Sequence, residues 1–191
     1  KLVPPIGMAT FAADVREWYW DGAKWMESLL NTLLMAYLAT VIGTALGGFL
    51  SFFAARNLAQ HYAVYWITRR VLEVARTVPD IVWALLFVAI FGPGALAGTL
   101  AIAFRSIGFV GKLVGEALEE SNRGTIEALE ATGAPWVSRL AWGYWPQVKP
   151  AFWSIALFRW DINVRESAVL GLVGAGGIGM TLDSALNLFQ W

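Results

Sequence analysis

The sequence contains no cysteine, one histidine and no net charge, and each of these shortages excludes a class of function. Without cysteine there is no disulfide framework and no thiolate metal site. His61 has no acidic neighbour at a metal-ligand spacing, and neither a Ser-His-Asp arrangement nor a GxxxxGK phosphate loop is present. The 14 basic and 14 acidic residues cancel, which offers no bulk attraction to nucleic acid. We therefore expect no catalytic residue, no metal site, no cofactor and no nucleic-acid partner on this chain.

The chain is rich in long apolar runs. Hydrophobic residues make up 58% of it and charged residues only 15%, whereas soluble domains carry about a quarter charged residues. Residues 28–55 include no Asp, Glu, Lys or Arg, and about 20 such residues are enough to cross a bilayer as a helix. Gly43, Gly47 and Gly48 within this run predict close packing against another membrane helix. The sequence predicts an all-α polytopic membrane protein.

A second uncharged run, residues 81–104, is interrupted by Gly92-Pro93-Gly94. A helix through this triplet is unfavourable, so two helices joined by a tight turn are expected. The first of them should extend back through Arg69 and Arg76, and the second forward to about Leu118. Together with residues 28–55, the run 151–171 and the C-terminal apolar residues, about five helical membrane segments are visible.

The distribution of basic residues predicts the orientation. Four Arg lie in residues 56–76, five basic residues lie between Arg105 and Lys149, and none lies at 92–98. Because positively charged loops stay in the cytoplasm, both long connections are expected there and the turn outside. Residues 1–27 are then an extracytoplasmic, interfacial segment, and residues 28–191 are the transmembrane domain. Because no initiator Met is present and the chain stops within apolar sequence, we expect flanking helices to be missing.

Residues 119–147 are polar enough to leave the bilayer. Thr125 is the expected N-cap of a short helix, and Gly133 is the expected left-handed residue at its end. Pro135 suits the first position of a second helix, which returns to the membrane at Pro146. The sequence thus predicts a cytoplasmic helix, a sharp turn and a second helix.

This loop and three other segments resemble a known family. Glu127-Ala128-Leu129, Gly133 and Pro146 are similar to the E-A-A…G…P loop of ABC importer permeases, although Leu129 replaces an Ala and Gly143 stands in a usually apolar position. Residues 75–84 (ARTVPDIVWA), 159–167 (RWDINVRES) and 169–179 (VLGLVGAGGIG) resemble the phosphonate-importer permeases. The similarity covers roughly residues 28–190.

The resemblance implies the transmembrane domain of a type I ABC importer, located in the cytoplasmic membrane of a prokaryote. Residues 127–129, 133 and 146 would form the coupling helix that transmits ATPase closure. The implied partners are a second permease copy, two cytoplasmic ATPases that bind ATP and Mg, and an extracytoplasmic binding protein. The implied substrate is a phosphonate, with phosphite, hypophosphite and phosphate left open. An ATP-independent secondary transporter or channel, or an intramembrane enzyme, are the alternatives outside the family.

Four charged residues fall within the predicted membrane helix at 151–171. At about 100° per residue, Arg159, Asn163 and Glu166 share one face, with Ser167 at its edge. Because intramembrane charges mark transport paths and Arg binds tetrahedral oxyanions with two hydrogen bonds, we predict that this face lines the pathway. Arg159 and Glu166, about 10 Å apart along the helix, are expected not to touch directly.

Asp161 and Arg165 lie on the opposite side of the same helix, four residues apart. They are predicted to form a structural ion pair that packs against a neighbouring helix. The alternative for all four charges is that they hold the dimer or the helix bundle together.

Glycines at 174, 176, 177 and 179 fit the G-x-G-x-x-G pattern of dinucleotide sites. Such a motif is meaningful only after a strand, and here it follows a membrane helix. Gly174, Gly176, Gly177 and Gly179 are instead predicted to permit non-helical backbone or close packing at the outer mouth.

Overall fold

A computed structural model describes residues 22–59 and 61–187, and within these ranges every regular element is a helix. The elements are α2 (Gly22–Ala54), α3 (Tyr62–Thr77), α4 (Asp80–Phe91), α5 (Ala95–Glu119), α6 (Arg123–Ala131), α7 (Trp136–Ser138), the π-helix η1 (Arg139–Tyr144), α8 (Trp145–Leu170), the 3₁₀-helix η2 (Gly171–Val173) and α9 (Gly177–Asn187). The all-α prediction is confirmed.

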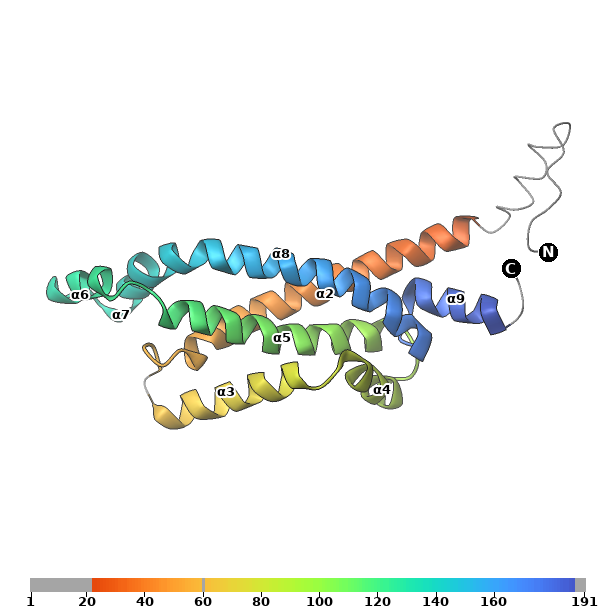
Figure 1. The fold of residues 1–191 in the computed structure, drawn as a ribbon, viewed down its shortest axis with the longest axis horizontal. Coiled ribbons are helices and arrows are strands. Elements are labelled where there is room, and N and C mark those ends of the chain that lie inside the picture. The colour runs from red at the N-terminus through yellow and green to blue at the C-terminus, as the bar shows by residue number, and fades with distance from the viewer. Residues whose placement is uncertain (1–21, 60, 188–191) are drawn as a thin grey trace, which may run out of the picture.

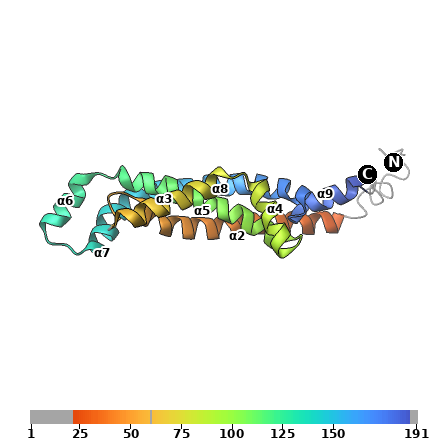
Figure 2. The ribbon, with the colours of Figure 1, turned by 90° about the horizontal axis from the view of Figure 1, so that it is seen from below.

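The three long helices α2, α5 and α8 pack side by side along the long axis of the molecule, and α3 packs on α5 (Figure 1). The helices α4 and α9 lie toward one end. At the other end, α6 and α7 project beyond the remaining helices as a separate hairpin (Figure 2). The short polar segment therefore stands apart from the apolar bundle.

Among the described residues, membrane-spanning length is met by α2, by α5 and by the stretch Trp136–Asn187, which is helical except at residues 174–176. The pair α3–α4 would form a fourth span if its two bent parts are counted together. Side chains on the outside of these helices are largely apolar, as Leu34 on α2 and Leu157 on α8 illustrate. Apolar outer surfaces of this kind suit contact with lipid.

The contact between α2 and α5 depends on small residues, as the sequence predicts. A Cβ on Gly43 would overlap the side chain of Ser106, and one on Gly47 would lie 2.9 Å from the carbonyl oxygen of Ile107. Gly48 meets the ring of Phe152 on α8 in the same way. The glycines thus let two helix backbones approach closely, which is how membrane helices gain packing energy.

One predicted helix is wrong. The expected continuous helix from Arg69 to the Gly92 turn is broken between Thr77 and Asp80, and α3 and α4 meet at 93°. Pro79 explains the break because it has no amide hydrogen and disfavours helical backbone at Val78, which is extended with ψ 129°. The turn itself is as predicted, since α4 ends at Phe91 and α5 begins at Ala95.

The predicted boundary between an interfacial segment and the transmembrane domain falls inside α2. This helix begins at Gly22, so residues 22–27, including Trp25, belong to it. The remainder of the predicted segment, residues 1–21, lies outside the described residues.

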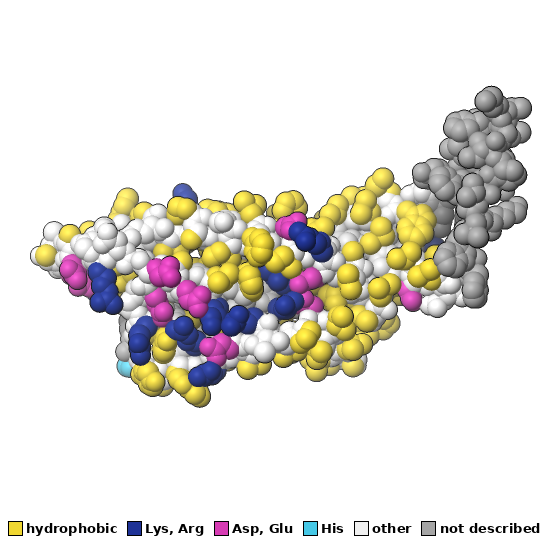
Figure 3. Space-filling model, in the orientation of Figure 1, with side chains coloured by type: hydrophobic (Ala, Val, Ile, Leu, Met, Phe, Trp, Pro, Cys, Tyr) yellow, Lys and Arg dark blue, Asp and Glu magenta, His cyan; other side chains and the backbone are white. Residues whose placement is uncertain are grey.

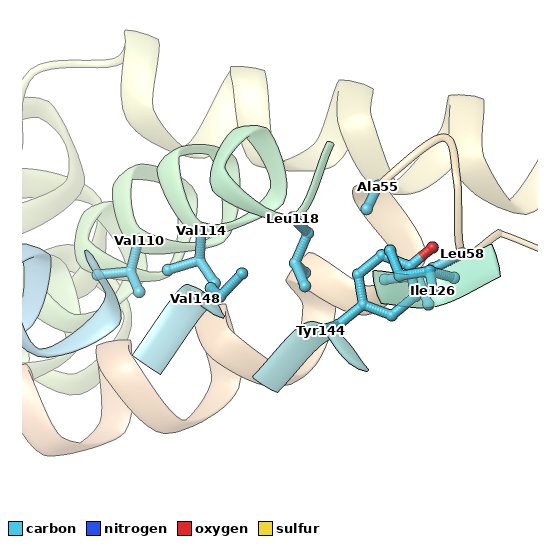
Figure 4. Packing of buried hydrophobic residues seen from close by; sticks show 8 residues of the cluster. All are labelled: Ala55, Leu58, Val110, Val114, Leu118, Ile126, Tyr144 and Val148. Atoms are coloured by element: carbon cyan, nitrogen blue, oxygen red, sulfur yellow. The ribbon is translucent and has the colours of Figure 1, made fainter. Parts of the chain in front are cut away.

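Two apolar clusters form the core. The first lies toward α6 and brings together Val110, Val114, Leu118, Val148 and Tyr144 with Ala55, Leu58 and Ile126 (Figure 4). The second lies toward α4 and contains Ala39, Ala84, Ala101, Ile102, Ala103, Leu170 and Ala175. Between the two clusters, α5 and α8 also contribute polar and charged residues, namely Arg105, Ser106, Arg159, Asn163 and Glu166. This polar layer contains most of the predicted pathway residues.

Candidate functional site

Arg159 is the centre of the polar layer and is only 1% exposed. Its Nε donates to the Ser106 hydroxyl at 2.9 Å, its NH2 donates to Glu166 Oε2 at 2.9 Å, and its guanidinium lies 5.5 Å from the centre of the Phe109 ring. The expectation that Arg159 and Glu166 do not touch directly is wrong. The two long side chains extend toward each other along one face of α8 and bridge the two helical turns between them.

Asn163 joins three helices. Its Nδ2 donates to the Thr40 hydroxyl on α2 at 2.8 Å, and its Oδ1 lies 3.2 Å from the Ser106 hydroxyl on α5. Asn163 and Ser167 are both 0% exposed, and the Ser167 hydroxyl donates to the Val164 carbonyl within α8. Of the four predicted pathway residues, Arg159, Asn163 and Ser167 are therefore enclosed by the bundle, and Glu166 reaches its edge.

Two charged residues of the layer were missed by the sequence analysis. Arg105 NH1 contacts Glu166 Oε1 at 3.0 Å and also forms an ion pair with Asp80, the first residue of α4. Arg105 lies inside α5, in agreement with the predicted helix that extends to about Leu118, and the orientation predicted from the basic residues remains a prediction. Each residue has one sequence feature that could have pointed to this layer. Asp80 lies in segment 75–84, which resembles the phosphonate-importer permeases, and Arg105 directly follows the uncharged run 81–104.

The four charges, which we call the charge network, are Asp80, Arg105, Arg159 and Glu166. Two positive and two negative groups cancel, which lowers the cost of holding them in a membrane protein. Asp80 Oδ1 is buried and has no hydrogen-bond partner among the described residues. The network joins α4, α5 and α8. One of its cations, Arg105, is partly exposed, with 31% of its side chain accessible.

Asp161 and Arg165 form the predicted ion pair on the other side of α8. The side chains are 57% and 74% exposed, so they do not pack against a helix within the described part of the chain. The role of this pair as a structural contact with a neighbouring helix remains a prediction.

The helix of the predicted coupling loop begins one turn earlier than expected. The N-cap of α6 is Asn122, whose side chain accepts a hydrogen bond from the Gly124 amide at 2.9 Å, so the assignment of Thr125 is wrong. At the other end Gly133 has a φ of 73°, and the Ala134 amide donates to the Leu129 carbonyl at 3.1 Å. This pattern is a Schellman termination, which a left-handed glycine permits.

The second helix of the loop starts at Trp136, with Pro135 as its N-cap rather than its first residue. It continues through the π-helix into α8, where Pro146 lies in the first turn. A Cβ on the buried Gly143 of the π-helix would lie 3.1 Å from the Leu129 side chain. The larger Leu129 and the smaller Gly143, the two departures from the family pattern, therefore face each other and compensate in size.

One side of α6 is anchored and the other is free. Ile126 is buried and packs with Leu58 and Tyr144 in the first core cluster (Figure 4). Glu127 and Ala128 are exposed to solvent. The hairpin is therefore attached firmly to the bundle while it presents an exposed face beyond it.

The glycine segment after α8 leaves the helical conformation. Gly174, Gly176 and Gly177 have φ values of 81°, 86° and 74°. The Gly174 carbonyl accepts a hydrogen bond from the Gly94 amide at 2.9 Å, and a Cβ on Gly176 would lie 2.7 Å from the Ala95 nitrogen. A Cβ on Gly179 would overlap the Ala168 carbonyl. Both predicted features, non-helical backbone and close packing, are present, whereas the position at an outer mouth remains a prediction.

The comparison with known proteins identifies the family. The family described as "Binding-protein-dependent transport system inner membrane component" matches residues 47–190. The chain belongs to this family. Its sequence is 38% identical over 185 residues to the phosphite transport system permease protein PtxC of Stutzerimonas stutzeri, covering 96% of this chain and 67% of PtxC.

The chain is also similar to the phosphate-import permease protein PhnE of Mycolicibacterium smegmatis, at 42% identity over 170 residues. That match covers 89% of this chain and 32% of PhnE. The resemblance to permeases of the phosphonate group is confirmed by these relatives.

The fold is shared with permeases of solved structure. A chain of the inward-facing MetNI methionine ABC transporter aligns with a TM-score of 0.74 and 22% identity, covering 86% of this chain and 82% of that chain. A chain of an amino acid ABC transporter aligns with a TM-score of 0.72 and 20% identity, covering 91% and 84%. The predicted type I ABC importer fold is confirmed.

Proposed function

We propose that this chain is a permease subunit of an ATP-driven importer for a small phosphorus oxyanion such as a phosphonate, phosphite or phosphate. The observation that carries the proposal is the family match over residues 47–190, together with relatives whose names specify phosphite and phosphate transport. Hypophosphite is close to these anions in size and charge and stays within the proposed substrate class. The proposed location is the cytoplasmic membrane of a prokaryote.

The proposed partners act at the two ends of the bundle. Two cytoplasmic ATPases, which bind ATP and Mg, would contact the α6–α7 hairpin, and a binding protein would deliver the anion on the extracytoplasmic side. A second permease copy would complete the transmembrane unit. The exposed Glu127 and Ala128 on a hairpin anchored through Ile126 support this assignment, because an anchored helix transmits force to the bundle.

The pathway role of Arg159, Asn163, Glu166 and Ser167 remains part of the proposal. Glu166, with a side chain 19% exposed, is the member that would meet the path. Arg159 is a positioning residue, because its guanidinium is engaged by Glu166, Ser106 and Phe109. An Arg159→Ala variant that folds and transports at the wild-type rate would remove Arg159 from the pathway.

The coupling assignment is tested by ATP-dependent anion uptake into proteoliposomes that contain the permease, its ATPase and its binding protein. Glu127→Lys reverses an exposed charge on α6, and Glu120→Lys makes the same change at an exposed position at the end of α5. We expect Glu127→Lys to lower uptake and co-purification with the ATPase, and Glu120→Lys to lower neither. Equal behaviour of the two variants would contradict a coupling role for this face.

A further inference from the structure

A stripe of non-buried residues runs along one face of α5. It consists of Arg105, Phe109, Lys112, Glu116 and Glu119, which we call the α5 stripe, spaced alternately four and three residues apart. At about 100° per residue these five positions fall within about 80° of the helix circumference. The charged members are 21–40% exposed, and most of the rest of α5 is packed against α2, α3, α4 and α8.

The stripe faces the space between α3 and α8. Arg69 of α3 contacts Glu119 at 3.2 Å, and the ring of Phe109 lies 6.3 Å from that of Phe158 on α8. Figure 3 shows the charged side chains gathered between α8 and α3, over α5, while the part of this face near α4 and α9 is mainly hydrophobic. On this face, many of the charges thus form one band over α5.

The inner end of the stripe lies too deep for contact with the membrane surface. Arg105 is 14 residues from the end of α5 at Glu119, or about 21 Å along the helix, and 10 residues from its start at Ala95, or about 15 Å. A charged side chain at this depth does not face lipid, and it lies against protein or a water-filled path. Its partial exposure of 31% leaves room for water beside it.

The stripe ends at Arg105. One and two turns further on, the same face of α5 continues as Ile102, which is 0% exposed, and Gly98, whose Cβ would overlap Ala175. Ile102 belongs to the second apolar core cluster, and Gly98 contacts Ala175 of the same cluster. This cluster fills the bundle beyond Arg105. The polar band therefore extends to the α6 end of α5 and ends just beyond the charge network.

We propose that the α5 stripe lines a water-filled path that opens toward the coupling end, and that Arg105, not the enclosed Arg159, is the cation that the transported oxyanion meets. This inference rests on the proposed function for the identity of the anion. Asp80 and Glu166 hold the Arg105 guanidinium in place, and Glu116 lies 3.6 Å from Lys112, so the two positive and two negative groups of the stripe leave it with no net charge. Weak binding of this kind lets an anion pass without being trapped.

The natural absence of cysteine allows a direct test by single cysteine substitution. Phe109→Cys and Lys112→Cys lie on the stripe, Val110→Cys is buried, and Leu157→Cys is 63% exposed on the apolar outside of α8. Each is labelled with a charged, water-soluble thiol reagent in everted membrane vesicles that contain the assembled transporter. We expect labelling at 109 and 112 at least about tenfold faster than at 157 and 110, because only a hydrated thiol ionises readily to the reactive thiolate.

Labelling at 157 as fast as at 109 and 112, or no labelling on the stripe, would overturn the inference. The second case would mean that protein, such as another permease copy, covers the stripe. If the stripe fails this test while phosphorus oxyanions still stimulate ATP hydrolysis, only the inference falls and the proposed function stands. If the stripe is labelled but no anion is transported, the proposed function falls and the hydrated stripe remains.

The role of Arg105 is tested in the Phe109→Cys background, one helical turn away. Phosphite or a phosphonate at saturating concentration should slow labelling at 109 when Arg105 is present and should have no effect in the Arg105→Gln variant. Val110→Cys placed in the Arg105→Gln variant must stay unlabelled, which shows that the bundle remains packed. Equal protection with and without Arg105 would assign the anion contact to another residue.

Discussion

The two ion pairs on α8 have the same chemistry but opposite surroundings. Arg159 and Glu166 have side chains 2% and 19% exposed, whereas Arg165 and Asp161 have side chains 74% and 57% exposed. The first pair is joined to α2, α4 and α5 through Ser106, Asn163, Thr40, Arg105 and Asp80. Within the described part of the chain, the contact given for the second pair is the ion pair between its own two members.

The difference shows that a charge in a membrane helix has no single meaning. The buried pair replaces water with a continuous set of donors and acceptors, so removing one member leaves others unpaired. When one member of the exposed pair is replaced, the other member loses only that one contact. In a membrane its outward face requires water or another protein, and the proposed second permease copy would supply such a surface.

Replacing Arg159 should have the largest effect. Arg159→Met removes the partner of Glu166 Oε2 and one hydrogen bond to Ser106, and it leaves Arg105 as the one cation of the charge network against Asp80 and Glu166. The loss of one member of a buried pair costs about 3–5 kcal/mol. The matched variant Arg165→Met should cost less than about 1 kcal/mol, as exposed pairs do. Thermal unfolding of both variants in the same detergent measures the difference, and similar losses would contradict the comparison.

Replacing Asn163 should have an intermediate effect. Asn163→Leu removes the hydrogen bond to Thr40 and the contact with Ser106, and unsatisfied buried polar groups cost about 1–3 kcal/mol. Asn187→Leu is the control, because Asn187 is exposed and bonds only to Asp183 one turn away among the contacts described. A fall in the unfolding temperature for Asn187→Leu as large as that for Asn163→Leu would show that the three-helix junction contributes little.

The smallest effect is expected from uncoupling the exposed pair. In detergent, a double-mutant cycle with Asp161→Asn and Arg165→Gln should give an interaction energy of about 0.2–1 kcal/mol. If another protein covers this face in the assembled transporter, the same cycle measured there should give a larger interaction energy. A value that is the same in both settings would argue against the predicted contact with a neighbouring helix.

Periodicity within one helix was readable from the sequence, whereas contacts between helices were not. The shared face of Arg159, Asn163 and Glu166 follows from helix geometry alone, and so does the Asp161–Arg165 pair. The length of the uncharged run similarly predicted α2. Each of these inferences depends on residues that are close in the sequence.

The misses have a common physical origin. Asp80 and Arg105 reach Glu166 from α4 and α5, and no local pattern shows which face of those helices meets α8. Pro79 is a local signal for the break, but a helix that ends there is too short to cross a membrane, and the length requirement favoured one continuous helix. The cap was assigned to Thr125 because both Thr and Asn cap helices well, and only the hydrogen bond from Gly124 to Asn122 decides between them.

The most direct test of the proposed function is the ATPase activity of the reconstituted permease with its ATPase and binding protein. The measurement is made across phosphonate, phosphite, hypophosphite and phosphate, with sulfate as a tetrahedral anion that lacks phosphorus. We predict that at least one phosphorus oxyanion, only in the presence of the binding protein, stimulates hydrolysis while sulfate does not. Failure of the permease to associate with any ATPase, or equal hydrolysis with every anion, would contradict its assignment as a phosphorus-oxyanion importer.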